Sequence, residues 1–224
     1  MSMILRIRDR YGRFLSLLVA IVGYLLVYPL LVDSQSSVVL LVLTLGIPVA
    51  GVYAVSASRR DLVIASVLAL PLVADYMTPG TDWPLVLSMG FPLLLYLFVL
   101  ATVVGHVLSS RQVTLDTLFG AAAGYLLMGL AWATAYSWIE RSSPGSFVIN
   151  PANDVGSTGI QWFDAVHFSY VTLTTLGYGE ITPVSAFARS LSFLEAIAGV
   201  LYIAFLVARL VSGYITEDEL AMRG

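Results

Sequence analysis

The sequence has no cysteine and no lysine, and it has few charged residues of any kind. The absence of cysteine excludes disulfide bonds and thiolate metal sites. Charged residues make up only 11% of the 224 positions, whereas soluble domains carry about 25%. Hydrophobic residues make up 58%, and the mean hydropathy is +0.89. We therefore expect an integral membrane protein in contact with a lipid bilayer, and no nucleic-acid partner.

Apolar runs of the length that crosses a bilayer recur along the chain. A transmembrane helix needs about 20 predominantly apolar residues. Six runs are predicted to span: Phe14–Val32, Val38–Val55, Leu62–Met77, Leu85–Leu108, Leu118–Ile139 and Arg189–Tyr214. A shorter run, 161–174, is too brief to span and is predicted to be a re-entrant helix. The predicted fold class is an all-α membrane protein with six transmembrane helices and one re-entrant helix.

The arginines are distributed unevenly among the segments between these runs. With six spans, nine of the eleven fall on one face, and only Arg141 and Arg189 fall on the other. Basic segments stay in the cytoplasm, so we expect a multi-pass plasma-membrane protein with both termini inside. The N-terminal arginines can also lie on anionic lipid headgroups. We favour their role as topology determinants.

Residues 174–180 follow the re-entrant helix and read TTLGYGE. A dehydrated potassium ion needs about eight oxygen ligands, which stacked rings of backbone carbonyls supply. For all carbonyls to face one axis, alternate residues must adopt left-handed dihedrals, which glycine takes without steric cost. Gly177 and Gly179 have this spacing, so a selectivity filter for K⁺ is predicted. The expected K⁺-coordinating residues are Thr175, Leu176, Gly177 and Tyr178, with Gly179 completing the filter.

This filter motif occurs once, and no internal repeat of it exists. One segment supplies one carbonyl to each ring, and a ring around an axis requires four. We therefore expect a homotetramer, a closed ring of identical contacts, that forms one central pore.

The chain from about Arg111 to Gly213 resembles the pore module of the potassium-channel superfamily, in particular short bacterial ion channels. The resemblance rests on YLLMG at 125–129 with Trp132 and Tyr136, on PGSF at 144–147, on FSYVTLTT at 168–175, and on Arg189 with LEAIAGVLY at 194–202. It implies an outer helix, a turret, a pore helix with its filter, and an inner helix. It also implies passive conduction of K⁺, with no enzymatic activity, no cofactor and no identifiable soluble ligand.

Two filter positions depart from the family pattern, because Leu176 replaces valine or isoleucine and Glu180 replaces aspartate. The resemblance implies that Glu180 faces His167 behind the filter, with Thr174 also supporting it. A carboxylate against an imidazole would be a titratable contact, since histidine changes charge near physiological pH. The alternative is a neutral histidine bonded to nearby backbone, without a regulatory effect.

The inner helix is predicted to carry the gate. Gly199 lies at a position where the inner helix commonly bends in the family that this region resembles. A face of residues at three- to four-residue spacing follows it and forms a hydrophobic constriction if it lines the pore: Val200, Ile203, Val207 and Val211. The alternative is an ordinary lipid-facing or packing surface. Glu195, a charge within this helix, is expected to hold the back of the pore helix, with a second titratable site as the alternative.

Four regions are predicted: a basic cytoplasmic N-terminus (1–13), a four-helix transmembrane domain (14–110), a pore domain (111–214) and a short cytoplasmic tail (215–224). Six spans with a pore after the fifth is the layout of voltage-gated channels. The fourth span has no lysine or arginine, and His106 is its one basic candidate, so conventional voltage sensing is not expected. Asp75 and Asp82 have no assigned role. The alternatives are a weakly selective cation channel, or a non-conducting membrane sensor or accessory subunit.

Overall fold

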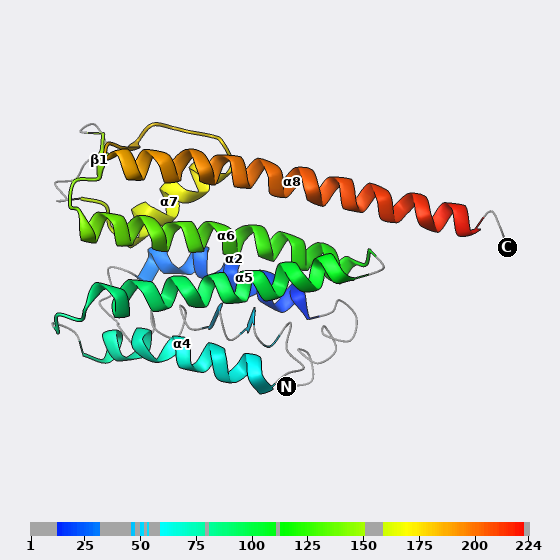
Figure 1. Ribbon diagram of the computed structural model, residues 1–224, viewed down its shortest axis with the longest axis horizontal. Helices are drawn as coiled ribbons and strands as arrows, with labels where there is room; N and C mark the ends of the chain where they lie inside the picture. Colours follow the sequence, from blue (N-terminus) through cyan, green and yellow to red (C-terminus); the bar gives the residue numbers. More distant parts are fainter. Residues whose placement is uncertain are drawn as a thin grey trace.

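The structure is a computed structural model, and it describes residues 13–31, 46–47, 50–51, 53, 59–78, 81–110, 113–150 and 159–221. Figure 1 shows long helices that run roughly side by side, with the C-terminal part of the last helix projecting beyond the others. In chain order the elements are α2 (Phe14–Leu31), α4 (Arg59–Met77), the π-helical turn η2 (Val86–Gly90), α5 (Phe91–Ser109), α6 (Leu115–Ser142), β1 (Phe147–Ile149), α7 (Trp162–Leu173), β2 (Ile181–Pro183) and α8 (Ala186–Ala221).

Four helices of the described part are long and apolar enough to cross a membrane. They are Phe14–Leu31, Val86–Ser109, Leu115–Ser142 and the Ala186–Arg209 part of α8. The fold is therefore that of a mainly helical membrane protein. Helix α4 corresponds to the third expected span but has two arginines and an aspartate in its first turn. The second expected span, Val38–Val55, lies mostly outside the described residues.

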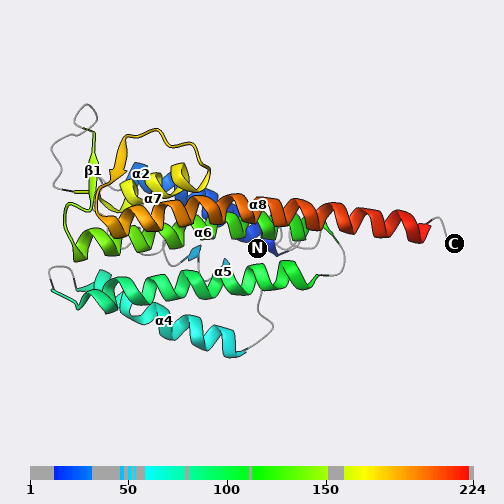
Figure 2. The same cartoon turned by 45° about the horizontal axis from the view of Figure 1, so that its top comes forward.

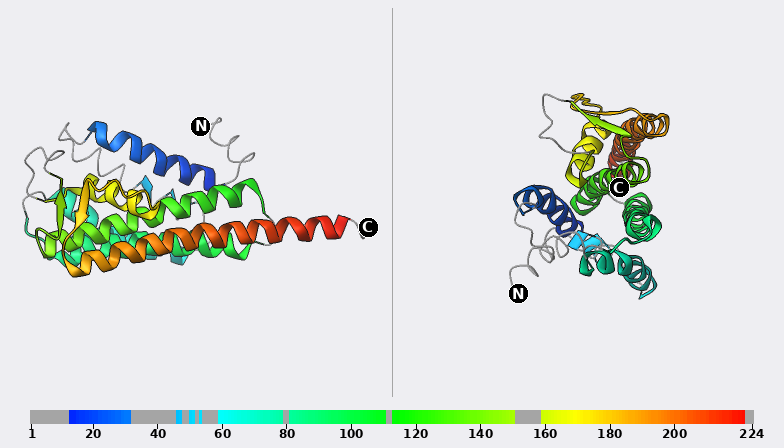
Figure 3. Two further views of the ribbon diagram at one scale, coloured as in Figure 1. Left: turned by 90° about the horizontal axis from the view of Figure 1, so that it is seen from above. Right: turned by 90° about the vertical axis from the view of Figure 1, so that its left-hand side faces the viewer.

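Helix α6 is the centre of the packing, because α2, α5, α7 and α8 all contact it. In Figures 1 and 2, α5 lies beside α6 and α4 lies on the far side of α5. Small residues permit these close approaches. A Cβ atom at Gly129 would overlap the ring of Tyr170 on α7, and one at Gly120 would crowd Val107 on α5 and Phe14 on α2. The short helix α7 is thereby held against α6 (Figure 3).

Helix α8 differs from α6 in how little of it is covered. In the most apolar window of each helix, 56% of the residues of α6 are buried but only 11% of those of α8. Large apolar side chains are exposed along α8: Phe193, Leu194, Ile197, Val200, Leu201, Ile203, Phe205 and Val207. A helix that is apolar all round is stable in lipid or against further protein, not in water.

The fourth predicted span is irregular at its N-terminal end. A π-helical turn covers Val86–Gly90, and the regular α5 begins at Phe91 with Pro92 in its first turn. Proline has no N–H to donate and fits the first turn of a helix, whereas in a helix interior it breaks a hydrogen bond. The change from π to α geometry immediately before Pro92 therefore accommodates the proline within one continuous span.

A small antiparallel sheet lies at the end of the molecule where the filter segment ends. Strand β1 pairs with β2 in the register Phe147↔Pro183, Val148↔Thr182 and Ile149↔Ile181. The carboxylate of Glu140, in the last turn of α6, accepts hydrogen bonds from the N–H groups of Gly145 (2.8 Å) and Phe147 (3.1 Å). The sequence analysis did not predict these strands or the role of Glu140. Together they tie the turret to the segment that follows the filter.

Candidate functional site

Helix α7 leads into the filter segment and is fixed at both ends. At its start, the Trp162 indole N–H donates to the hydroxyl of Tyr24 on α2 (2.7 Å). Near its end, the Tyr125 hydroxyl of α6 donates to the carbonyl of Leu173 (3.1 Å). The Tyr170 hydroxyl donates back to the carbonyl of Leu126 (2.8 Å). Side chains from α2 and α6 thus set the position and direction of α7.

The filter segment has an alternating backbone. Thr175, Gly177 and Gly179 have φ angles of +59°, +60° and +76°. Every second residue is therefore left-handed, which is the alternation that turns successive carbonyls toward one side. The glycine spacing predicted this conformation for Gly177 and Gly179 but not for Thr175. Continuing the two-residue spacing backward from Gly179 and Gly177 would have identified Thr175 as the next left-handed position. This conformation costs a non-glycine residue about 1–2 kcal/mol.

The N–H groups at the start of the filter turn back onto the pore helix. Those of Leu176 and Gly177 donate to the carbonyl of Val171 (2.9 and 3.3 Å), and that of Thr175 donates to the carbonyl of Thr172 (2.9 Å). Within the described part of the chain, no carbonyl of residues 175–179 accepts a hydrogen bond. These oxygens are therefore available to a cation.

The C-terminal end of the filter segment, at Glu180, is held mainly by its backbone. The N–H of Asn150 donates to the carbonyl of Glu180 (2.7 Å), next to the β1–β2 ladder. The resemblance implied that His167 and Glu180 face one another; in the structure Nε2 and Oε2 are 3.9 Å apart, which is beyond hydrogen-bond distance. The His167 ring stacks on that of Tyr178, with centroids 6.4 Å apart. The Thr174 hydroxyl donates to the Tyr170 carbonyl (2.6 Å) and so closes the end of α7.

Glu195 is fully buried where α6, α7 and α8 meet. Its Oε2 accepts a hydrogen bond from the Tyr136 hydroxyl of α6 (2.5 Å), and its Oε1 lies 2.6 Å from the hydroxyl oxygen of Ser169 on α7. Ser169 also lies 2.7 Å from the carbonyl of Gly129. This is the position expected of a structural charge behind the pore helix. The sequence analysis did not identify Ser169 as its partner.

Comparison with known proteins bears on this arrangement. A family model described as "Ion channel" matches residues 124–215, which contain most of α6, the filter and most of α8. Over 78 residues the chain is 35% identical to the inward rectifier potassium channel Kirbac3.1 of Paramagnetospirillum magnetotacticum. The aligned stretch covers 35% of this chain and 21% of that protein. Residues 124–215 of this chain thus belong to an ion-channel family, and the chain is similar to named potassium channels.

Two further relatives show how far the likeness extends. The hyperpolarization-activated voltage-gated potassium channel of Methanocaldococcus jannaschii is 34% identical over 92 residues, 41% of this chain and 34% of that protein. Protein LctB of Geobacillus stearothermophilus is 29% identical over 103 residues, 46% of this chain and 76% of that protein. The chain thus spans about a third or less of the two named potassium channels. No solved structure matches it significantly.

Gly199 on α8 lies against the end of the pore helix α7. A Cβ atom there would overlap the carbonyl oxygen of Leu173, so the glycine permits the backbones of α8 and α7 to touch. The predicted hinge is therefore also a packing contact. Val200, Ile203 and Val207 of the predicted gate are about half-exposed on α8. The side chain of Val211 lies outside the described residues.

A second link joins α8 to α5, a helix that precedes the pore region. The guanidinium of Arg209 on α8 donates to the carbonyls of Leu108 and Ser110, at the C-terminal end of α5. These carbonyls include one that has no partner within the helix, which a cationic side chain satisfies. The sequence analysis used Arg209 only as a topology determinant, because its partners are about 100 residues earlier in the chain.

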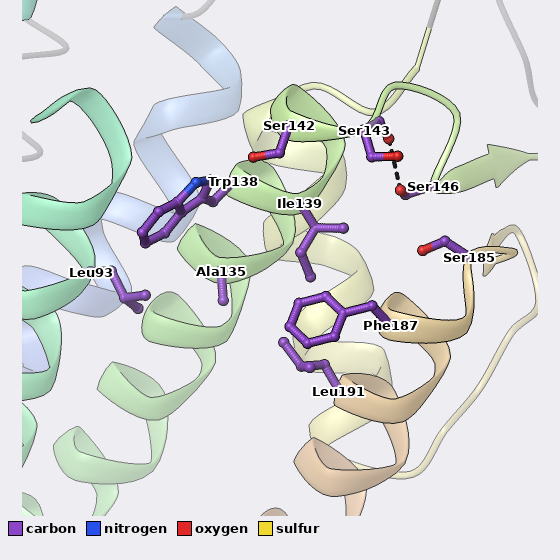
Figure 4. Close-up of a pocket in the computed structure, with 10 residues that line it drawn as sticks. All are labelled: Leu93, Ala135, Trp138, Ile139, Ser142, Ser143, Ser146, Ser185, Phe187 and Leu191. Atoms are coloured by element: carbon purple, nitrogen blue, oxygen red, sulfur yellow. Dashed lines mark hydrogen bonds between the residues drawn. The ribbon is translucent and has the colours of Figure 1, made fainter. Parts of the chain in front are cut away.

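An apolar cavity of about 460 Å³ lies between α5, α6 and α8 (Figure 4). Leu93, Trp138, Phe187 and Leu191 form its apolar walls, and serines gather toward one end. One of them, Ser146, donates its hydroxyl to the Ser143 carbonyl (2.7 Å). No filter residue lines this cavity.

Proposed function

We propose that the protein is a potassium-selective channel that conducts K⁺ passively across the plasma membrane, with both termini in the cytoplasm. The observation that carries the proposal is the left-handed backbone at Thr175, Gly177 and Gly179, combined with carbonyls that accept no hydrogen bond from the described residues. Rings of such carbonyls replace the hydration shell of K⁺. The matching ion-channel family model covers this segment, and two relatives named as potassium channels are 35% and 34% identical to the chain over 78 and 92 residues. The activity is transport, not enzymatic catalysis.

The proposed assembly is a homotetramer. Each chain supplies one filter segment, so about eight oxygen ligands around an ion require four copies about one axis. Two surfaces of the single chain support this. Leu176 and Tyr178 are more than half exposed, and the apolar face of α8 is uncovered. In a tetramer, neighbouring chains would cover much of both surfaces.

The proposed gate is the inner helix, bending at Gly199 and closing at Val200, Ile203, Val207 and Val211. Hydrophobic constrictions of this kind close by losing their water. Conventional voltage sensing is not proposed, because α5 carries no arginine or lysine. The four-helix domain would instead act on the gate through contacts such as that of Arg209.

A weakly selective cation channel is the second candidate, and one observation favours it. His167 and Glu180 are 3.9 Å apart, so no hydrogen bond between them secures the outer filter. A filter held less firmly can admit ions of other sizes. The two candidates share the same fold and differ in the measured selectivity.

The deciding experiment is flux into proteoliposomes that contain the purified protein, measured for K⁺ and for Na⁺ with Ba²⁺ as blocker. Gly177→Ala is the control, because alanine is strained at a φ of +60° and should disrupt the carbonyl rings. Barium-sensitive flux that strongly favours K⁺ and is lost in the control supports the first candidate. Equal Na⁺ and K⁺ flux, lost in the same control, supports the second. Flux unchanged in G177A would refute the assignment of the filter.

A further inference from the structure

A second cavity, of about 200 Å³, lies between the N-terminal helices and the pore module. It is bounded by α2, α4, η2, α5, α6 and the first residue of α7, so it joins both parts of the chain. Its lining residues are Tyr28, Leu72, Asp75, Ser88, Met89, Pro92, Tyr96, Thr134 and Trp162. None of them belongs to the filter or to the predicted gate.

Two polar groups of this cavity have no partner in the described part of the chain. The Ser88 side chain is only 3% exposed, and its hydroxyl makes no hydrogen bond there. Asp75, in the last turn of α4, forms no ion pair or hydrogen bond with a described residue. A buried hydroxyl without a partner loses its hydrogen bonds to water and gains none in return, which is unfavourable. A carboxylate within a membrane-spanning domain is normally paired or functional. Both groups are therefore suited to a ligand that donates hydrogen bonds.

The other walls of the cavity define the charge and size of that ligand. Tyr28, Tyr96 and Trp162 provide aromatic rings, whose negative faces attract cations. Leu72, Met89 and Pro92 provide apolar surface for a short hydrocarbon group. We propose that this cavity binds a small organic ammonium ion, with its nitrogen donating to Asp75 and Ser88 and its carbon atoms packed among the aromatic rings.

Other occupants fit the lining less well. An anion would face the carboxylate of Asp75. Calcium requires six to eight oxygen ligands and magnesium requires octahedral oxygen coordination, whereas this cavity offers one carboxylate and a few hydroxyls. Indeed, no group of three or more His, Cys, Asp or Glu residues that could hold a metal ion occurs in the described ranges. A water molecule would satisfy Ser88 but would leave the charge of Asp75 unneutralised.

The position of the cavity links its occupant to the pore helix. Trp162 is the first residue of α7, and its indole N–H donates to Tyr24 on α2. An ammonium ion against this ring contacts the element that carries the filter. Any effect on conduction rests on the proposed channel function, but binding itself does not. The test therefore measures binding directly.

The probe is cyclohexylammonium, titrated by isothermal calorimetry into the purified full chain in detergent. Cyclohexanol is the neutral control ligand. We expect saturable binding of the amine, with affinity falling about tenfold or more in Asp75→Asn, since a charge-assisted hydrogen bond is lost. Asp82→Asn is the matched control variant, because it removes the same charge from a residue that lies in the exposed segment after α4 and does not line the cavity.

A second variant keeps the inference testable if Asp75→Asn does not fold. Ser88→Ala removes one acceptor with little change in volume and should weaken binding by about threefold or more, as expected for one hydrogen bond. Amine that binds in the ion pathway would keep its affinity in both cavity variants. Unchanged affinity in both cavity variants would overturn the proposal. So would equal affinity for cyclohexanol, an equal loss of affinity in Asp82→Asn, or the absence of saturable binding to the parent protein.

Discussion

Replacing Glu195 by methionine tests whether its carboxyl group fixes the pore helix. Methionine has a similar length and keeps the buried site filled, but it cannot accept the short hydrogen bond from Tyr136. The Tyr136 ring is fully buried, so its hydroxyl would lose this acceptor without reaching water. An orphaned buried donor costs about 1–3 kcal/mol. For a chain of this length, about 2 kcal/mol corresponds to a decrease of about 4–8 °C in melting temperature.

Glutamine at the same position should be tolerated much better, because its amide can donate a proton to the hydrogen bonds around Ser169 and its carbonyl can still accept one. The Ser169 hydroxyl has one proton but lies within 2.7 Å of two oxygens, Glu195 Oε1 and the Gly129 carbonyl. The carbonyl can only accept. Both contacts are satisfied together when the residue at 195 supplies a proton of its own, which the glutamine amide does. We expect Glu195→Gln to lower the melting temperature by less than half as much as Glu195→Met.

The assay is thermal unfolding of the purified protein in detergent, followed by intrinsic fluorescence. Adding Tyr136→Phe to the Glu195→Met variant removes the orphaned hydroxyl, and it should recover at least half of the lost melting temperature. Two results would refute the reasoning. One is a Glu195→Gln variant as unstable as Glu195→Met, and the other is no recovery in the double variant.

Three further predictions concern the inner helix and the filter. Gly199→Ala should lower the melting temperature and alter flux, since its Cβ would overlap the Leu173 carbonyl; the same change at Gly105, where a Cβ meets no neighbouring atom, should have little effect on either. Arg209→Gln should change the open fraction in flux assays while leaving K⁺/Na⁺ selectivity unaltered, and an altered selectivity would contradict a purely coupling role. Glu180→Gln should change the free energy of unfolding by less than about 1 kcal/mol, because the exposed pair of Glu180 and His167, with 3.9 Å between Oε2 and Nε2, is weak. A large fall in melting temperature would show a stronger contact than the structure has.

Local patterns in the sequence predicted much of the pore module. The apolar runs placed most helix ends within about three residues, and the glycine spacing at Gly177 and Gly179 predicted where the backbone turns left-handed. Thr175 was not predicted to share this conformation, because threonine has no intrinsic preference for positive φ. Its backbone is set by the bonds from residues 175–177 to the pore helix.

Features that depend on distant partners were not predicted. Ser169 and Glu140 belong to no recognisable local pattern, since their roles come from contacts with α8 and with the turret. The β1–β2 pair consists of two three-residue strands that come together because the filter returns the chain to the end of α6. Periodicity over such short segments cannot separate a strand from a loop. The pairing is therefore a consequence of the fold around the filter.

The contacts along α8 constrain how the proposed gate can move. Glu195 fixes the helix to α6 and α7 at one level, and Arg209 ties it to the end of α5 fourteen positions later. Gly199 lies between these two points. A bend there that displaces the lower part of α8 must either carry the Leu108–Ser110 corner with it or break the hydrogen bonds of Arg209. Helix α5 carries no arginine but is connected through Arg209 to the proposed gate, so a stimulus that shifts α5 has a direct route to α8.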